Sequence, residues 1–342
     1  IIEGFDNHLN SKLEVLLIGH SLGLDSGYFF PEVYKETTGK DVVLGMIYHS
    51  GCRLGQHVKY IKGNEKQYAY YEFDTRVDTN WRRADARTSE DAAMTFHAVE
   101  PSAANDTLIN DGVIGVTMKD GITRADWDVV IMQAGVFDAA DKQDDPQYDM
   151  NTTSNVQYIR QHVLDNDIEK RSTPKFGWNI TWASPSSDAS FWESTENYVN
   201  VYRRHNNNFY WQYGKDANDM YADIATTYQN KIATAGTWDY LMPSGTAVHN
   251  AKSVMPDEAI YRDVIHVGDF GRLMAAYIWT CQIEDITMVD IPEITSIYSQ
   301  LRYYAADRKS GDYVLTTSEQ AILRKAVNAA IETPLALTDL NN

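Results

Sequence analysis

The sequence has little of what a disulfide scaffold, a zinc site or a membrane anchor would need. Only two cysteines, Cys52 and Cys281, occur in 342 residues, so at most one disulfide can form. Neither belongs to a cluster with the spacing of zinc ligands. No apolar run approaches the ~20 residues that cross a bilayer. We therefore expect a folded protein that does not insert into a membrane.

Positive charge is also scarce. Lysine and arginine number 30 against 48 aspartates and glutamates, which gives a formal net charge of −18. A protein with this balance repels phosphate backbones and anionic lipid, so nucleic acid is not an expected partner. Hydrophobic residues make up 43% and charged residues 23% of the chain, which is ordinary for a globular protein with a sizeable core.

The sequence opens with Ile1 and not with methionine. This start favours a chain from which an export signal has been removed, so we expect an extracytoplasmic location, periplasmic or secreted. The composition leaves the oligomeric state open.

Short apolar runs alternate with longer helical patterns along the chain. The runs are almost wholly apolar, as in the strands of a parallel sheet that is covered on both faces. They predict strands at Leu13–Ile18, Val42–Tyr48, Trp127–Met132, Lys175–Trp182 and Trp238–Met242. Helical spacing predicts helices at Ser26–Thr37, Ser154–Asp165, Ser194–Thr234, Asp269–Ile283, Ile294–Asp307 and Thr317–Thr333.

This alternation predicts a three-layer α/β/α sandwich around a central, mainly parallel sheet. We expect one domain over residues 1–342. The polar stretch from Tyr60 to Asp126 is expected to form an insertion over one edge of the sheet, with a strand at Tyr68–Phe73. Residues 285–342 are expected to form a C-terminal helical extension.

A serine between glycines follows the first predicted strand. The stretch Gly19-His-Ser-Leu-Gly23 matches the G-x-S-x-G pattern of the α/β-hydrolase nucleophile elbow. In that fold several strands precede the elbow, whereas here only one strand precedes Ser21. Ser21 therefore fits either a nucleophile of another fold or the cap of a helix.

A histidine near the far end of the chain has an aspartate three residues before it. In the stretch Tyr261–Asp269, Asp263 precedes His266 at this spacing. A serine hydroxyl becomes a nucleophile when an imidazole accepts its proton, and a carboxylate on the other ring nitrogen fixes the tautomer of that imidazole. Asp263 and His266 could supply both groups from one short segment, with Asp269 as the N-cap of the following helix.

Together these blocks resemble the SGNH/GDSL hydrolase superfamily, and most closely a bacterial branch of SGNH-type proteins. The blocks are Val15–Ser21, His49–His57, Trp127–Gln133, Thr181–Trp182, Gly245–Ala251 and Asp263–Tyr277. Their order along the chain carries the resemblance, and they extend from about residue 13 to residue 284. The resemblance implies a catalytic triad of Ser21, His266 and Asp263, and no metal or cofactor.

The resemblance also implies an oxyanion hole formed by the backbone amides of Ser21 and Gly51 and a third donor. Most superfamily members supply the third donor from the Asn of a Gly-x-Asn block, but here Gly135-Val-Phe places Phe137 at that position. In the closer branch a glutamine ends the same strand, and Gln133 matches it. A buried glutamine bonded to loop backbone is the competing interpretation of Gln133.

Three further residues of the matched blocks are expected to contact the substrate: His20, Trp182 and His249. His20 stands where the superfamily usually has Asp or Asn, and it could line the site or cap the end of the strand. Aromatic residues beside the blocks could stack on sugar rings or fill the core. They are Tyr48, Trp178, Trp182, Trp192, Tyr210 and Trp211.

The resemblance implies a serine esterase that removes acetyl or similar acyl groups from carbohydrate, with a small-molecule or glycan ester as its partner. Because His266 must be neutral to act as the base, we expect activity to fall when acid protonates its imidazole. Two alternatives remain. One is a glycan-binding protein on the same scaffold without catalysis, and the other is a metal-dependent phosphoesterase.

Overall fold

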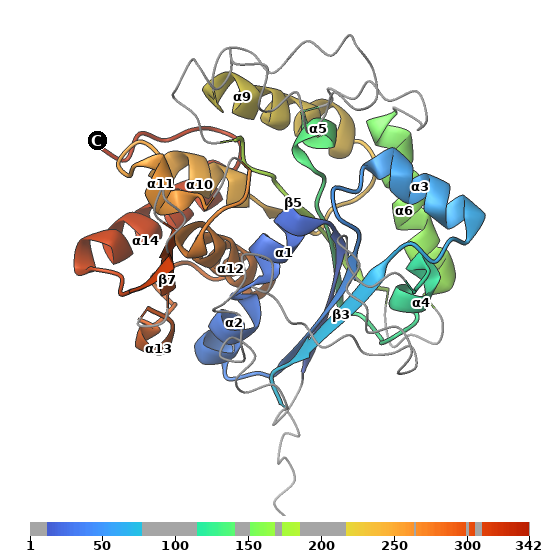
Figure 1. The fold of residues 1–342 in the computed structure, drawn as a ribbon, viewed down its shortest axis with the longest axis horizontal. Coiled ribbons are helices and arrows are strands. Elements are labelled where there is room, and N and C mark those ends of the chain that lie inside the picture. Colours follow the sequence, from blue (N-terminus) through green and yellow to red (C-terminus); the bar gives the residue numbers. More distant parts are fainter. Residues whose placement is uncertain are drawn as a thin grey trace, which may run out of the picture.

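The computed structural model is built around a six-stranded sheet with helices on both faces (Figure 1). It describes residues 12–76, 115–140, 151–167, 173–184, 217–262, 265–298, 301–304 and 310–341. In spatial order the strands are β3 (Ala69–Asp74), β2 (Val42–Tyr48), β1 (Leu13–Gly19), β4 (Val129–Met132), β5 (Lys175–Asn179) and β6 (Tyr240–Met242). The predicted three-layer α/β/α class is confirmed.

All neighbouring strands are parallel except the edge pair β2 and β3. The chain runs from β1 outward to β2 on one side and later returns to place β4 on the other side of β1. The order of the strands therefore reverses between β1 and β4. In open α/β sheets, ligands bind beside such a reversal, at the carboxyl ends of the strands.

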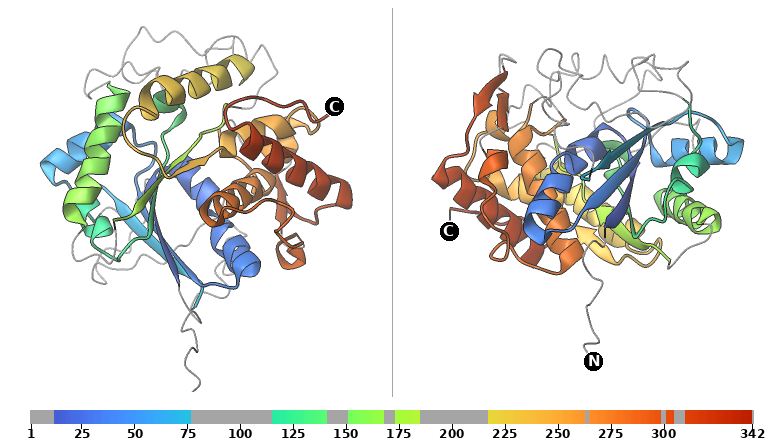
Figure 2. Two further views of the ribbon diagram at one scale, coloured as in Figure 1. Left: turned by 180° about the vertical axis from the view of Figure 1, so that it is seen from behind. Right: turned by 90° about the horizontal axis from the view of Figure 1, so that it is seen from below.

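The helices form two layers (Figures 1 and 2). One layer holds α1 (Ser21–Gly27), α2 (Phe30–Thr38), α10 (Ser244–Ala251), α11 (Asp257–Ile260), α12 (Asp269–Glu284), α13 (Thr295–Tyr298) and α14 (Thr317–Glu332). The other holds α3 (Leu54–Gly63), α4 (Met118–Ile122) and α6 (Thr152–Asn166). Helix α9 (Ala217–Thr227) packs against the short α5 (Val136–Ala139).

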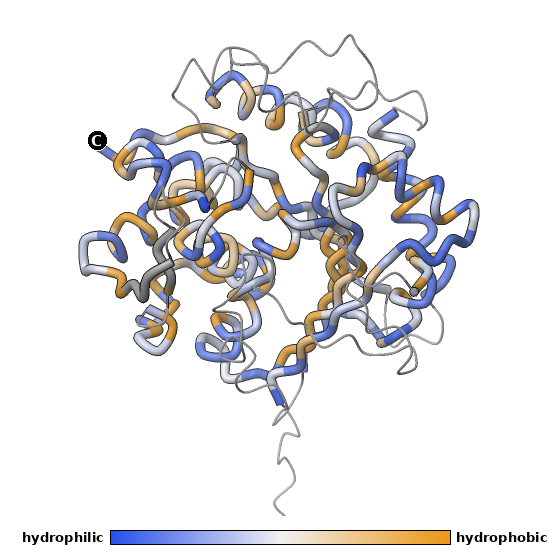
Figure 3. The backbone as a smooth tube through the Cα atoms, in the orientation of Figure 1, coloured by the Kyte–Doolittle hydropathy of each residue, from blue (hydrophilic) through white to orange (hydrophobic). Residues whose placement is uncertain are grey.

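The inner strands are buried along nearly their whole length, as the apolar runs predicted (Figure 3). Every residue of β1 after Leu13 is buried, and so are all four residues of β4. Burial on both faces follows from the two helical layers. No helix in the described part of the chain is long and apolar enough to cross a membrane.

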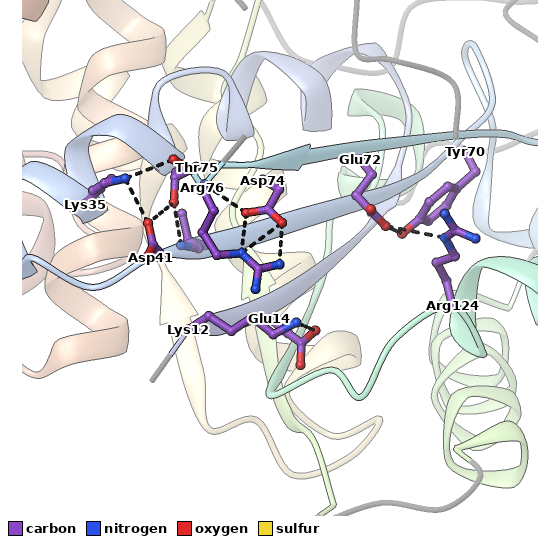
Figure 4. Close-up of polar contacts among 11 residues, drawn as sticks. Lys12, Glu14, Lys35, Asp41, Tyr70, Glu72, Asp74, Thr75, Arg76 and Arg124 are labelled. Atoms are coloured by element: carbon purple, nitrogen blue, oxygen red, sulfur yellow. Dashed lines mark hydrogen bonds and ion pairs between the residues drawn. The ribbon is translucent and has the colours of Figure 1, made fainter. Parts of the chain in front are cut away.

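Ion pairs gather near the amino ends of β1 and β2 (Figure 4). Lys35 contacts Asp41 at 2.8 Å, and Asp41 accepts a hydrogen bond from Thr75 at 2.9 Å. The Thr75 hydroxyl in turn accepts the amide of Val42, the first residue of β2. The carboxyl ends of these strands lie at the opposite edge of the sheet.

The helix predicted at Ser26–Thr37 is two helices. Helix α1 begins five residues earlier, at Ser21, and α2 begins at Phe30. Pro31 lies in the first turn of α2 and has no backbone N–H. It therefore cannot continue the hydrogen bonds of α1, but it is well suited to start a new helix.

The helix predicted at Ile294–Asp307 is confirmed near its start and is wrong at residues 301–304. Helix α13 ends at Tyr298, and β7 (Leu301–Tyr304) follows and pairs antiparallel with β8 (Ser310–Tyr313). Helical spacing could not show this pairing because the partner strand comes later in the chain. The helix predicted at Thr317–Thr333 is confirmed as α14.

Three other predicted segments are confirmed only in part. Strand β5 ends at Asn179 and not at Trp182, because its neighbour β6 has only three residues. In the predicted helix Ser194–Thr234, α9 is followed by a π-helical turn at Tyr228–Ile232, and residues 194–216 lie outside the described residues. From the predicted polar insertion, β3 adds an edge strand beside β2, while residues 77–114 lie outside the described residues.

Candidate active site

The residues predicted to be catalytic follow the carboxyl ends of the central strands. Ser21 comes two residues after β1, and Gln133 comes directly after β4. These two strands are neighbours and flank the reversal of strand order. The loop that carries Gly51 follows β2, on the other side of β1. The topology therefore brings three of the predicted residues to one edge of the sheet.

Ser21 and His266 are in direct contact although 245 residues separate them. The Oγ of Ser21 lies 2.9 Å from the Nε2 of His266, within hydrogen-bond distance. Both side chains are half-buried. Ser21 is the first residue of α1, and His20 is the N-cap of this helix. The alternative that Ser21 is itself the cap is therefore wrong, and its hydroxyl faces the imidazole.

The loop that holds His266 is closed by backbone contacts. Tyr261 and Val267 form an antiparallel bridge, and the amide of Arg262 donates to the carbonyl of His266 at 3.0 Å. The indole N–H of Trp182 donates to the carbonyl of Ile265 at 2.7 Å. These contacts fix the backbone on both sides of the imidazole. Asp263 lies outside the described residues, so its part in the triad stays a prediction.

Trp182 was expected to contact the substrate, and the structure gives it another position. Its side chain has no exposed surface, since its relative accessibility is 0%. It follows β5 and reaches the loop before α12 through its indole N–H. We therefore assign Trp182 to the positioning of His266 and correct the expected substrate contact.

His249 is corrected in the same way. It lies on α10 and is 6% exposed. Its Nε2 lies 2.7 Å from the Oδ1 of Asn218, and its ring stacks on Tyr221 with centroids 5.1 Å apart. These contacts join α10 to α9, so His249 holds two helices together.

Gly51 occupies a turn that needs a glycine. The amide of Cys52 donates to the carbonyl of His49 at 3.2 Å, and Gly51 has a φ of +59°. A positive φ at the third residue of a turn strongly favours glycine. The amide of His49 donates to the carbonyl of Gly19, which joins this turn to the end of β1. Gly51 is exposed and its amide donates to no described residue, so the amide is available to a ligand.

Gln133 is buried, and only one end of its amide has a partner. Its Oε1 lies 3.0 Å from the Oγ of Ser26 on α1. Its Nε2 has no hydrogen-bond partner in the described part of the chain, although the side chain is only 2% exposed. Most buried donors in proteins are hydrogen-bonded, so an unpartnered one calls for an explanation.

His20 is buried beside the site and neutral. Its Nδ1 accepts the amide of Leu22 at 3.3 Å, which places the ring proton on Nε2. Burial lowers its pKa to about 4, and the nearby His266 adds to the decrease. The cap position explains this histidine. With 3% exposure it forms a wall of the site and offers little surface to a substrate.

A buried cluster of charges joins the helix of Ser21 to the helix after His266. Arg272 on α12 contacts Asp25 on α1 at 2.8 Å and Asp269 at 2.9 Å, and both Asp25 and Arg272 are 0% exposed. Arg262 contacts the same Asp25 at 3.2 Å. Asp269 is the first residue of α12, and Gly268 is the N-cap, so the predicted capping role of Asp269 is wrong.

No group of three or more His, Cys, Asp or Glu side chains in the described part of the chain could hold a metal ion.

Of the aromatic residues considered for sugar stacking, Trp178 is 2% exposed and Tyr48 is half-buried. Trp192, Tyr210 and Trp211 lie outside the described residues. The buried tryptophans fill the core.

Four residues around the site were not found from the sequence: Asp25, Ser26, Asn179 and Arg272. Two of them left a signal. Asn179 is the polar end of an apolar strand, and Arg272 is a lone cation within the apolar Phe270–Ile278. A lone charge in an apolar helix indicates a buried partner, because an unpaired buried charge is very costly. The spacing could not identify that partner.

The fold is similar to a crystal structure, determined at 1.50 Å resolution, of a DUF4886 family protein from Bacteroides uniformis. The TM-score is 0.61, and the match covers 97% of this chain and 99% of that one. The two sequences are 17% identical, so the likeness concerns the fold alone. No protein-family model matches the sequence, and no curated protein matches it.

Proposed function

We propose that this protein is a serine esterase of SGNH type. The observation that carries the proposal is the contact of Ser21 Oγ with His266 Nε2 at 2.9 Å, at the reversal of strand order. A nucleophile and a base within hydrogen-bond distance are the minimum for activating a serine. Their place at the carboxyl edge of the sheet is where α/β folds bind ligands.

In the first half of the reaction the Oγ of Ser21 attacks the ester carbonyl carbon, and the Nε2 of His266 accepts the hydroxyl proton. The negative charge that develops on the carbonyl oxygen is stabilised by three N–H donors: the amides of Ser21 and Gly51, and the Nε2 of Gln133. The tetrahedral species collapses, the C–O bond to the alcohol breaks, and His266 returns the proton to the leaving oxygen.

In the second half, water replaces the alcohol. His266 accepts a proton from the water as its oxygen attacks the acyl carbon on Ser21, and the same three donors stabilise the second oxyanion. Collapse releases the carboxylic acid and restores the Ser21 hydroxyl. His266 returns its proton to the Oγ of Ser21, so the protein, the ester and water balance both halves.

For the substrate we propose an acetyl or similar short acyl ester of a carbohydrate. The resemblance to SGNH hydrolases supports this class. The net charge of −18 disfavours strongly anionic substrates, since association with them would be opposed by the field of the whole molecule.

The test measures hydrolysis of p-nitrophenyl acetate and a panel of acetylated glycans by the wild type, Ser21→Ala and His266→Ala. We expect both substitutions to reduce turnover by more than ~1,000-fold without unfolding the protein, because the nucleophile or its base is lost. Ser50→Ala is the control, since it removes a half-buried hydroxyl next to Gly51 while keeping the backbone.

Each alternative function has its own outcome in this test. Turnover that survives Ser21→Ala but disappears with a chelator would indicate a metal-dependent phosphoesterase. Affinity for glycans without hydrolysis of any ester, activated acetyl esters included, would indicate a binding protein. Either result would overturn the esterase proposal.

A further inference from the structure

We propose that Ser26 and Asn179 are positioning residues that set the direction of the Gln133 amide, so that its N–H groups face the reacting oxyanion. The inference deepens the proposed function and rests on it. A buried chain of hydrogen bonds supports this inference. It runs from α12 through the end of β5 to α1 and then to the residue that follows β4.

The chain begins at a group that can only donate. The indole N–H of Trp279 on α12 donates to the Oδ1 of Asn179 at 3.1 Å. The hydroxyl of Ser244 donates to the same oxygen at 2.7 Å. Because an indole nitrogen cannot accept, the atom of Asn179 that faces it must be the oxygen. The amide nitrogen of Asn179 therefore points the other way.

That nitrogen meets Ser26. The Nδ2 of Asn179 donates a hydrogen bond to the Oγ of Ser26 at 2.8 Å. The Ser26 hydroxyl is therefore an acceptor on the side that faces Asn179. The single proton of Ser26 then has two acceptors, each 3.0 Å away: the carbonyl of Leu22 and the Oε1 of Gln133. Only the oxygen of the Gln133 amide can accept this proton, so donation to Gln133 turns its Oε1 toward Ser26.

The other end of the Gln133 amide is a buried donor with no partner among the described residues. An unpartnered donor of this kind costs free energy in the resting protein, which is explained if the reaction supplies the acceptor. Gln133 directly follows β4, next to the strand that leads to Ser21. A fixed donor needs no reorientation when charge develops, and this is the main source of electrostatic stabilisation in such sites.

Burial keeps this chain of hydrogen bonds in one arrangement. Ser26, Asn179, Ser244 and Trp279 are each 0% exposed, so water does not compete for their hydrogen bonds. Asn179, Ser244 and Trp279 each find partners inside this network, which favours one set of orientations. The four residues come from α1, β5, α10 and α12, so the direction of one amide depends on the packing of four elements.

The experiment compares two variants that break this chain of hydrogen bonds. Ser26→Ala removes the hydroxyl that faces Gln133. Asn179→Asp keeps the shape and still accepts from Trp279, but an aspartate cannot donate to Ser26 and instead attracts its proton. The control is Thr280→Val, which removes another fully buried hydroxyl that donates to a helix carbonyl, at 2.9 Å, without touching the chain.

Each substitution is made in the wild type and in Gln133→Met, and kcat and KM are measured with p-nitrophenyl acetate. In the wild type we expect Ser26→Ala and Asn179→Asp to lower kcat by roughly tenfold, with KM changed less than twofold, because only transition-state stabilisation is lost. In the Gln133→Met background we expect neither Ser26→Ala nor Asn179→Asp to lower kcat further. Thr280→Val leaves kcat unchanged. Equal losses in both backgrounds would overturn the inference.

A second measurement does not depend on activity. The side-chain NH₂ signals of Gln133, identified in ¹H–¹⁵N spectra by their absence from Gln133→Met, report the environment of that amide. We expect them to shift in Ser26→Ala and Asn179→Asp and to stay in place in Thr280→Val. Signals insensitive to both variants would overturn the inference whether or not esterase turnover is found. If the amide signals shift as expected but no turnover depends on Ser21, the result would overturn the proposed function alone.

Discussion

Single side chains in this protein act on the site through backbone groups they hold in place. Trp182 is the clearest case. It is completely buried, and its only polar group bonds to the carbonyl next to His266. Its effect on catalysis would come through the position of the imidazole, without contact with the substrate.

We predict that Trp182→Phe lowers kcat about tenfold on p-nitrophenyl acetate with little change in KM, because the loop of His266 loses one hydrogen bond worth about 1 kcal/mol. Trp127→Phe is a matched control: this tryptophan is also buried, and its indole donates to the carbonyl of Ile122 at 2.9 Å. It should lower the thermal midpoint and leave kcat unchanged. A similar loss of kcat in both variants would contradict the positioning role of Trp182.

At the scale of elements, the site depends on the contact of α1 with α12. Helix α1 carries Ser21 at its first position, and α12 begins three residues after His266. The buried contact of Asp25 with Arg272 joins the two helices. The distance between nucleophile and base is therefore set by helix packing and not by the loop alone.

We predict that Arg272→Met lowers the free energy of unfolding by about 3–5 kcal/mol, because Asp25 and Asp269 lose their fully buried cationic partner. Adding Asp25→Asn should recover part of this loss. Urea unfolding measures both. Arg76→Met, which breaks the more exposed pair with Asp74, should cost less than about 1 kcal/mol. A small effect of Arg272→Met would show that the buried ion pair does not hold the helices together.

At the scale of the whole molecule, two buried histidines make the fold sensitive to acid. Burial lowers the pKa of His57 to about 3 and that of His20 to about 4. His57 lies on α3 and contacts the hydroxyl of Tyr68 through its Nδ1 at 3.0 Å. In the unfolded chain both imidazoles bind a proton near pH 6.5. Below that pH the unfolded state therefore binds protons that the folded state does not bind.

We predict that the free energy of unfolding decreases as the pH falls from about 6.5 toward 4, since a lowered pKa in the folded state makes stability rise with pH in this range. In His57→Gln the slope should be smaller by about one proton, which is ~1.4 kcal/mol per pH unit. Urea unfolding at a series of pH values gives both slopes. Identical slopes would show that His57 is protonated in the folded protein.

The sequence by itself determined the layered architecture and the pair at its centre. Nearly continuous apolar runs specify strands buried on both faces, and the resemblance of the ordered blocks to SGNH hydrolases implied Ser21, His266 and Gln133. These features depend on residues close together in the chain or on the order of elements, and a single sequence displays both.

Only the tertiary structure decided what surrounds that pair. The side-chain partners of Asp25, Ser26 and Asn179 lie 65 to 247 residues away in the chain, and no local pattern names them. The same holds for Trp182 and His249, whose residue types suggested substrate contact until burial excluded it. Burial and hydrogen-bond partners arise when distant elements pack, because each buried polar group must find its partner in three dimensions.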